Sequence, residues 1–297
     1  MPSPHPNALP NWIKRLPSPW RFCVSGLVQA ALRWIDAGGP SLGASIAFYA
    51  MFALAPMLVL AIAGAGLLFE AEAVRGQVFL QIRGLIGDDA ARTVEAMIRS
   101  ATLERGGMAA SLMGAATVVI GATGVFTELR RALNAMGAIT LRASLVSTVL
   151  RVRLAGLALV LGMGFLSIAS LILSAALSAA RELLGAHLGV LMHVMTVLDL
   201  GASTAVLTLA FAALLRWLPD RPASSKGTWI GALVSALLFA VGKHLLGLYL
   251  GTAGISSSYG AAGSFVMIML WVYYTAQILL FGGAVAYAMT KRQAAQG

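Results

Sequence analysis

Six long stretches of apolar residues, separated by shorter polar segments, dominate the pattern along the chain. They cover residues 42–69, 108–126, 154–177, 190–215, 228–250 and 263–289. A bilayer core about 30 Å thick needs roughly 20 apolar residues in a helix that rises about 1.5 Å per residue. Each isolated apolar segment must also pair its own backbone groups in lipid, which favours helices. The pattern predicts an all-α polytopic membrane protein with six transmembrane helices.

The composition excludes a soluble globular domain. Apolar residue types make up 59% of the 297 residues and charged types 11%, whereas soluble domains contain about 45–50% and about 25%. The few charged side chains cannot cover a water-facing surface of the necessary size. Cys23 is the single cysteine in the chain, so no internal disulfide can form.

The distribution of Lys and Arg indicates how the chain is oriented. With a cytoplasmic amino terminus, fourteen Lys and Arg residues lie in the inner segments and six in the outer segments. Because Lys and Arg accumulate on the cytoplasmic side, this count favours a multi-pass membrane protein with both termini in the cytoplasm. The net charge of +10 then reflects topology, and nucleic acid is not an expected partner.

Four segments outside the spans complete the predicted organisation of the chain. Residues 1–19 contain six of the ten prolines and are expected to form a disordered cytoplasmic tail, with residues 293–297 as a second short tail. In residues 20–36 the polar side chains of Arg21, Ser25, Gln29 and Arg33 recur every four positions opposite apolar ones. This is typical of an amphipathic helix in the membrane surface, although packing on the helix bundle explains the same pattern. Residues 70–107 are expected to form two amphipathic helices on the outer face. Residues 20–292 would then form one membrane domain.

Charged residues inside the spans point to a candidate site. Asp199 and Lys243 are expected at a similar depth on consecutive antiparallel helices, with His193 and His244 nearby. Charge within a membrane span is costly and usually faces a partner or water. Asp199 and Lys243 therefore form a structural charge pair, or the four residues form part of a path for a polar headgroup or an ion.

Two further features bear on movement and on lipid contact. Pro56 lies in the middle of the first span and is expected to kink that helix, because proline lacks a backbone donor and clashes with the preceding turn. Glu128, Arg130 and Arg131 follow the second span. They are expected either to contact lipid headgroups or to anchor the helix at the interface.

Three groups of motifs resemble the YihY/BrkB family of bacterial inner-membrane proteins, between about residues 20 and 292. The first is Ala44-Ser45-Ile46-Ala47-Phe48-Tyr49 followed by Leu54-Ala55-Pro56, with Phe126 and Ala132-Leu133-Asn134 further along. The second is Leu218-Pro219, Trp229, Gly231-Ala232-Leu233, Lys243 and Tyr249. The third is Tyr259-Gly260, Trp271-Val272-Tyr273-Tyr274 and Gly282. The chain has Gly282-Gly283-Ala284 where many relatives have Gly-Ala-Glu, so no role of that glutamate transfers here.

The resemblance implies six spans with both termini in the cytoplasm, and links to virulence and to envelope or lipid transport. It also brings a ribonuclease label, which the sequence does not support. The histidines are scattered, and the sequence contains no metal-ligand spacing, Walker A or GxSxG motif. We therefore expect no enzyme activity, no catalytic residues, no metal and no cofactor.

These observations lead to one functional hypothesis and one main alternative. The hypothesis is a transporter or translocation factor for a polar or amphiphilic substrate, such as a lipid, without an ATP site. The alternative is a non-transporting membrane scaffold or envelope assembly factor, and an intramembrane enzyme ranks below both. Membrane lipids are the expected partners, and the sequence leaves a homo-oligomer open.

Overall fold

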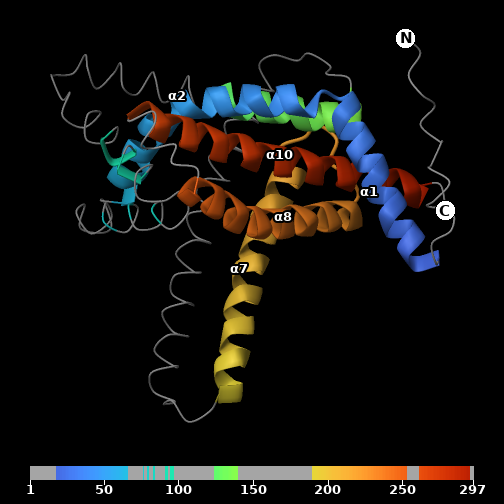
Figure 1. The fold of residues 1–297 in the computed structure, drawn as a ribbon. Coiled ribbons are helices and arrows are strands. Elements are labelled where there is room, and N and C mark those ends of the chain that lie inside the picture. The colour runs from blue at the N-terminus through green and yellow to red at the C-terminus, as the bar shows by residue number, and fades with distance from the viewer. Residues whose placement is uncertain are drawn as a thin grey trace. The chain divides into compact units, whose positions relative to one another are not determined.

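The computed structural model describes residues 18–65, 76, 79, 83, 91, 92, 94–96, 124–139, 189–252 and 261–294. Every regular element among these residues is helical (Figure 1), which confirms the all-α prediction for this part of the chain. The predicted spans 154–177 and most of 108–126 lie outside the described residues. The same holds for residues 1–17 and 295–297 and for most of the segment 70–107.

Four long helices correspond to four of the six predicted spans, and a further helix reaches only the end of the predicted span 108–126. The described helices are α1 (Ser18–Asp36), α2 (Gly39–Ala65), α7 (Gly189–Trp217), α8 (Ser225–Thr252) and α10 (Ala261–Ala294), and residues 124–137 form a further helix. The predicted ranges 42–69, 190–215, 228–250 and 263–289 correspond to α2, α7, α8 and α10.

Two of these helices contain segments that are long and apolar enough to cross a membrane. The segments are Ser225–Lys243 in α8 and Phe265–Lys291 in α10, with 19 and 27 residues. At about 1.5 Å per residue they extend about 28 Å and 40 Å, so the first nearly matches and the second exceeds a bilayer core of about 30 Å. The apolar part of α7, Gly201–Trp217, is shorter. Six transmembrane helices therefore remain a prediction.

The side chains of α8 are sorted by size between its two faces. The exposed face carries large apolar residues: Trp229, Ile230, Leu233, Leu237, Leu238, Val241 and Leu245. The buried face carries small ones: Gly227, Thr228, Gly231, Ala232, Ser235, Ala236 and Gly242. A surface helix of a soluble protein has its large apolar side chains inside, whereas membrane helices approach one another through small residues. The face of α8 that carries the large residues is therefore suited to lipid.

Packing divides the chain into two units, and α8 and α10 contribute residues to both. Unit 1 comprises Met1–Ala37, Leu133–Leu238 and Leu279–Gly297, and unit 2 comprises Gly38–Ala132 and Phe239–Ile278.

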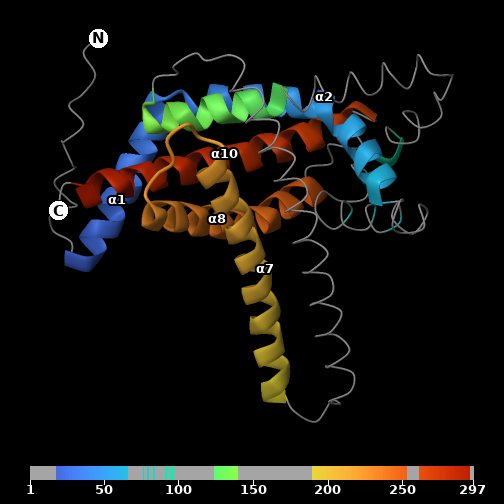
Figure 2. The ribbon, with the colours of Figure 1, turned by 180° about the vertical axis from the view of Figure 1, so that it is seen from behind.

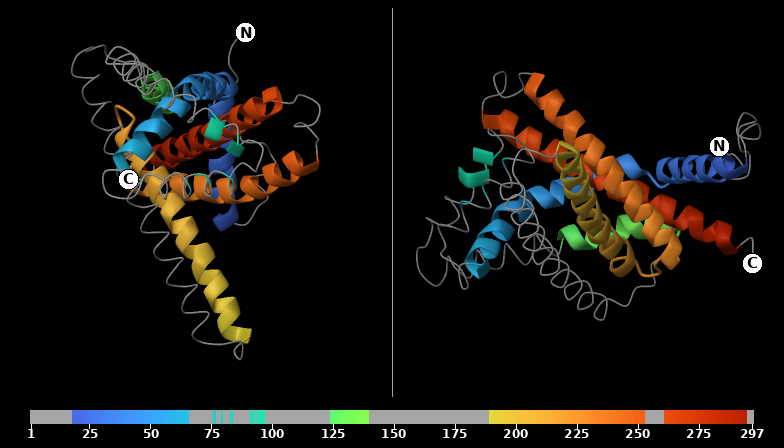
Figure 3. Two further views of the ribbon diagram at one scale, coloured as in Figure 1. Left: turned by 90° about the vertical axis from the view of Figure 1, so that its left-hand side faces the viewer. Right: turned by 90° about the horizontal axis from the view of Figure 1, so that it is seen from below.

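In unit 1, α8 and α10 lie in close contact (Figure 3). A Cβ atom at Gly231 would meet the carbonyl oxygen of Gly282, and one at Gly282 would meet the hydroxyl of Ser235. Ala284 and Val285 on α10 are completely buried. The position where many relatives of the resembled family carry glutamate is thus occupied here by an alanine with no exposed surface, inside an apolar contact.

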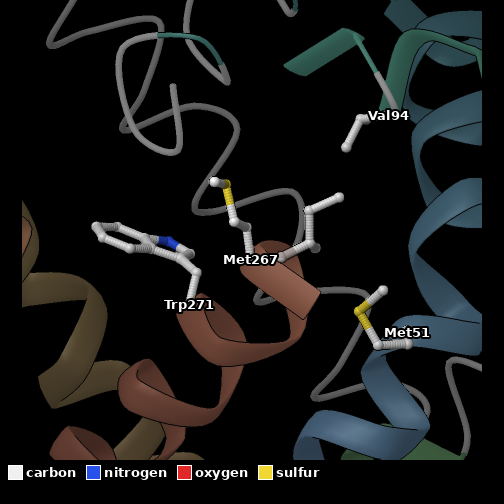
Figure 4. Packing of buried hydrophobic residues seen from close by; sticks show 5 residues of the cluster. Met51, Val94, Met267 and Trp271 are labelled. Carbon is white, nitrogen blue, oxygen red and sulfur yellow. The ribbon is translucent and has the colours of Figure 1, made fainter. Parts of the chain in front are cut away.

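The core of unit 2 is a cluster of large apolar side chains, shown in Figure 4. It contains Met51 of α2, Val94, and Met267, Ile268 and Trp271 of α10. Phe239 of α8 adds an edge-to-face contact with Trp271, with ring centroids 5.8 Å apart, a geometry favoured by the aromatic quadrupole. Apolar packing thus brings α2, α8 and α10 together in this unit.

Helix α1 turns part of its polar side toward the protein. Arg33 donates hydrogen bonds from Nε to the carbonyl of Met136 (3.0 Å) and from a terminal nitrogen to that of Ala135 (2.8 Å). Leu32 and Ile35 are exposed instead. The cation caps the carboxyl end of the helix 124–137, where the last carbonyls lack helical partners. The interfacial location of α1 remains a prediction.

Candidate functional site

A buried carboxylate lies between α2 and the helix 124–137 in unit 2. Glu128 is 8% exposed, and the hydroxyl of Ser45 donates a hydrogen bond of 2.8 Å to its Oε1. The second carboxylate oxygen lies 3.7 Å from a terminal nitrogen of Arg131, whose side chain is 66% exposed. We call Glu128, Ser45 and Arg131 the carboxylate site.

The surrounding contacts fix the distance between the two helices that form this site. The part of the helix 124–137 in unit 2 lies alongside α2 (Figure 2), and a Cβ atom at Gly124 would meet the ring of Tyr49 at 3.0 Å. A larger residue at Gly124 would require the ring of Tyr49 to shift. The glycine therefore permits the close approach that brings Ser45 within hydrogen-bonding distance of Glu128.

The carboxylate site has the chemistry of a group that binds a proton or a cation. As an ionised carboxylate, Glu128 accepts the Ser45 hydrogen bond and attracts Arg131. When protonated, a carboxyl group gains a donor and loses its attraction for the guanidinium. A buried ionisable group of this kind in a membrane protein is a functional-site candidate, because burial of its charge is costly.

A second polar site surrounds the α7–α8 turn (residues 218–224) in unit 1. Asn134, 1% exposed, donates from Nδ2 to Oδ2 of Asp220 at 2.8 Å and accepts from the backbone N–H of Asp220 at 3.0 Å. Tyr287 of α10 donates its hydroxyl to the carbonyl of Arg221 at 2.9 Å. These bonds join the turn to the helix 124–137 and to α10.

The last residue of the same turn, Ser224, caps the amino terminus of α8. Oγ of Ser224 accepts the backbone N–H of Gly227 at 3.1 Å, which is the bond expected of an N-cap serine. Oγ of Thr290 accepts the backbone N–H of Ser224 at 2.9 Å, and the Ser224 hydroxyl donates to Gln293 at 2.8 Å. The turn is therefore held from both sides by hydrogen bonds within the chain, an arrangement that serves stability.

The structure leaves the predicted charge pair within the membrane untested. Asp199 and His193 lie on α7, and Lys243 and His244 lie on α8. The side chains of Asp199, His193 and His244 lie outside the described residues, and Lys243 is exposed. Their pairing, and their role in a substrate path, remain predictions.

The predicted kink falls within a continuous helix. Residues 39–65 of α2 are helical through Pro56, and the ribbon of α2 changes direction in its carboxyl-terminal part (Figures 1 and 2). The side chain of Pro56 lies outside the described residues, so its part in this bend stays a prediction.

The residues that were predicted to contact lipid headgroups have contacts inside the protein. Glu128 and Arg131 are brought together, as described above, and Arg130 is half-buried. Contact of Arg130 and Arg131 with lipid stays a prediction. The sequence reasoning missed Ser45, Asn134 and Asp220 as partners, although Ser45 and Asn134 belong to the motifs that carry the family resemblance.

Among the described residues, no group of three or more His, Cys, Asp or Glu side chains is arranged to hold a metal ion. Within the same part of the chain, every buried side-chain nitrogen or oxygen has a hydrogen-bond partner.

Comparison with protein families gives a match over most of the chain. The family described as virulence factor BrkB matches residues 30–297. A UPF0761 membrane protein of Verminephrobacter eiseniae is 25% identical over 250 residues, which are 81% of this chain and 56% of the relative. A UPF0761 membrane protein of Rhodospirillum centenum is 24% identical over 285 residues, which are 95% of this chain and 61% of the relative. The chain thus spans less than two thirds of the length of these relatives.

A ribonuclease-like name occurs among the more distant matches. The protein YfkH of Bacillus subtilis, described as ribonuclease-like, is 28% identical over 94 residues, which are 31% of this chain and 34% of that protein. The match is too partial to carry an activity across. No solved structure matches the chain.

Proposed function

The chain belongs to the virulence factor BrkB family, and from this premise we propose that it moves a polar or amphiphilic substrate across the bacterial cytoplasmic membrane. It would cross the membrane six times, with both termini in the cytoplasm. Its relatives are named membrane proteins, and α8 and α10 each contain a segment able to span. The 27 residues of α2 and the 29 of α7 are also long enough for a span.

The observation that carries this proposal is the buried carboxylate of Glu128. A scaffold gains no stability from an ionisable side chain between two helices, because an apolar pair of similar volume is often at least as stable. In a transporter the same group can bind a proton or the cationic part of a substrate. Its partner Arg131, largely exposed, connects the carboxylate to the surface of unit 2.

Two steps follow from this geometry. When Glu128 is ionised, it accepts the Ser45 hydrogen bond that joins α2 to the helix 124–137, and it attracts Arg131 of its own helix. When the carboxyl group binds a proton or a cation, its charge no longer strengthens the Ser45 hydrogen bond, and the two helices are held less tightly. Movement of α2 at Pro56 would then accompany the binding event.

The experiment that tests the proposal measures lipid translocation in proteoliposomes. The purified chain is reconstituted with a fluorescent phospholipid in both leaflets, and dithionite is added outside. Wild-type protein should allow dithionite to bleach lipid from the inner leaflet as well as the outer one. Glu128→Gln should slow this several-fold without unfolding the protein, because the amide oxygen still accepts the Ser45 hydrogen bond.

The matched control is Glu95→Gln, which neutralises an exposed glutamate in unit 2 and should leave the rate unchanged. If wild-type vesicles protect their inner leaflet as well as protein-free vesicles do, lipid translocation is wrong. Equal rates for Glu128→Gln and the wild type would remove the carboxylate site from the mechanism.

A non-transporting scaffold is the second candidate, and the α8–α10 contact favours it. Gly231, Ser235 and Gly282 bring the two helices together without room for a further atom. A contact of this density is suited to a rigid support. Under this alternative Glu128 only fixes the register of two helices, and no bleaching of the inner leaflet is expected.

A further inference from the structure

Four exposed cations surround the α7–α8 turn in unit 1. Arg216 lies in the last turn of α7, Arg221 in the turn itself, Lys226 in the first turn of α8 and Lys291 near the end of α10. Lys291 belongs with the others because its neighbour Thr290 bonds to Ser224 of the turn. All four side chains are exposed.

The acidic residue of this turn offsets at most one of the four cations at the surface. Asp220 is half-buried, and its carboxylate accepts a hydrogen bond from Asn134 on the inner side. Arg216 donates to the carbonyl of Ala223 at 3.3 Å, which holds its guanidinium over the turn. The outward charge of the turn is therefore strongly positive.

Two exposed tryptophans place this surface at the boundary of the apolar region. Trp217 at the end of α7 is 56% exposed, and Trp229 in the first turns of α8 is 52% exposed. Tryptophan is enriched where the hydrocarbon core meets the headgroups. Beyond Trp229, the outer face of α8 continues with Leu233 and Leu237 along the candidate span Ser225–Lys243. The four cations therefore lie at the level of the lipid headgroups.

We propose that the α7–α8 turn and the end of α10 form a docking surface for anionic phospholipid headgroups, with Arg216, Arg221, Lys226 and Lys291 on the phosphates and Trp217 and Trp229 at the acyl boundary. Guanidinium and ammonium groups are the usual protein partners of phosphate. The exposed apolar row of α8 supplies the contact with the acyl chain. The proposal requires a membrane protein but does not depend on transport.

The experiment is native mass spectrometry of the full chain in detergent, after delipidation and titration with phosphatidylglycerol or phosphatidylcholine. The wild type should retain phosphatidylglycerol in preference to phosphatidylcholine. The double variant Arg221→Gln, Lys226→Gln should bind phosphatidylglycerol about 30-fold more weakly, because each cation near an anionic surface contributes roughly fivefold.

The matched control is Arg83→Gln, Arg92→Gln, which removes two exposed arginines of unit 2 and should leave phosphatidylglycerol binding intact. Equal weakening in both double variants, or equal retention of the two lipids by the wild type, would overturn the proposal. A third arm adds inorganic phosphate. If inorganic phosphate displaces the lipid completely at equal concentration, the surface is a site for free phosphate and the lipid assignment is wrong.

Discussion

Two buried polar side chains, Glu128 and Asn134, find their partners far away in the sequence. Ser45 precedes Glu128 by 83 positions, and Asp220 follows Asn134 by 86. Each bond joins one turn of the helix 124–137 to another element. A buried polar group without a partner costs free energy, so single polar residues decide which segments are held together here.

The Asn134–Asp220 pair gives a prediction about stability. Asn134→Ala should lower the free energy of unfolding by about 1–3 kcal/mol, because a buried pair of hydrogen bonds is lost. Unfolding by a denaturing detergent, followed by circular dichroism, measures the change. Ser203→Ala, at an exposed position of α7 in the same unit, should stay within about 0.5 kcal/mol of wild type. Equal stability of Asn134→Ala and Ser203→Ala would show that the pair contributes nothing.

These residue pairs could not be derived from the sequence. Spacing identifies neighbours on one helix, such as Glu128 and Arg131, because residues three or four positions apart share a face. It does not identify which distant segment lies opposite. Ser45 and Asn134 were visible as members of recurring motifs, but a motif gives no partner until the helices are placed.

At the level of helices, α8 shows why the long elements were predictable. The length of its apolar stretch predicts the approximate length of the helix. The same holds for α2, α7 and α10. Which face of α8 is buried was harder to predict from the sequence, because nearly every position is apolar and the hydrophobic pattern has little periodicity. Side-chain size carries the information in place of polarity, with small residues at the α8–α10 contact and large ones outside.

The two faces of α8 should respond differently to substitution. Gly231→Ala places a Cβ atom against the carbonyl of Gly282 and should cost about 1–3 kcal/mol of unfolding free energy, as overpacking usually does. Leu233→Ala, two residues further on the exposed face, should change it by about 0.5 kcal/mol or less. The same detergent titration compares them, and a larger loss for Leu233→Ala would mean that this face is covered by protein.

At the level of the whole molecule, the sequence predicts a six-span topology, and only part of it falls within the described residues. Two helices contain candidate spans, and the predicted spans 108–126 and 154–177 fall largely or wholly outside the description. The count of Lys and Arg remains the argument for both termini on the cytoplasmic side. The surface around the α7–α8 turn fits that side as well, because it gathers four cations.

Reporter fusions test this topology. Green fluorescent protein fused after Gly297 should fluoresce in cells, and alkaline phosphatase at the same position should be inactive, because the carboxyl terminus is expected in the cytoplasm. Alkaline phosphatase fused after Gly106, in the segment expected outside, should be active. Phosphatase activity after Gly297 would contradict the predicted orientation, and inactivity after Gly106 would contradict the outer location of that segment.

The division of α8 into a face of small residues and a face of large ones also determines which amino-acid substitutions this helix can accept during evolution. On the outer face, leucine, valine, isoleucine and phenylalanine should replace one another freely, since acyl chains adapt to any of these shapes. On the inner face, even one added methyl group meets a neighbouring helix. A saturation library of α8 should therefore separate into tolerant and intolerant positions that recur with the helical turn.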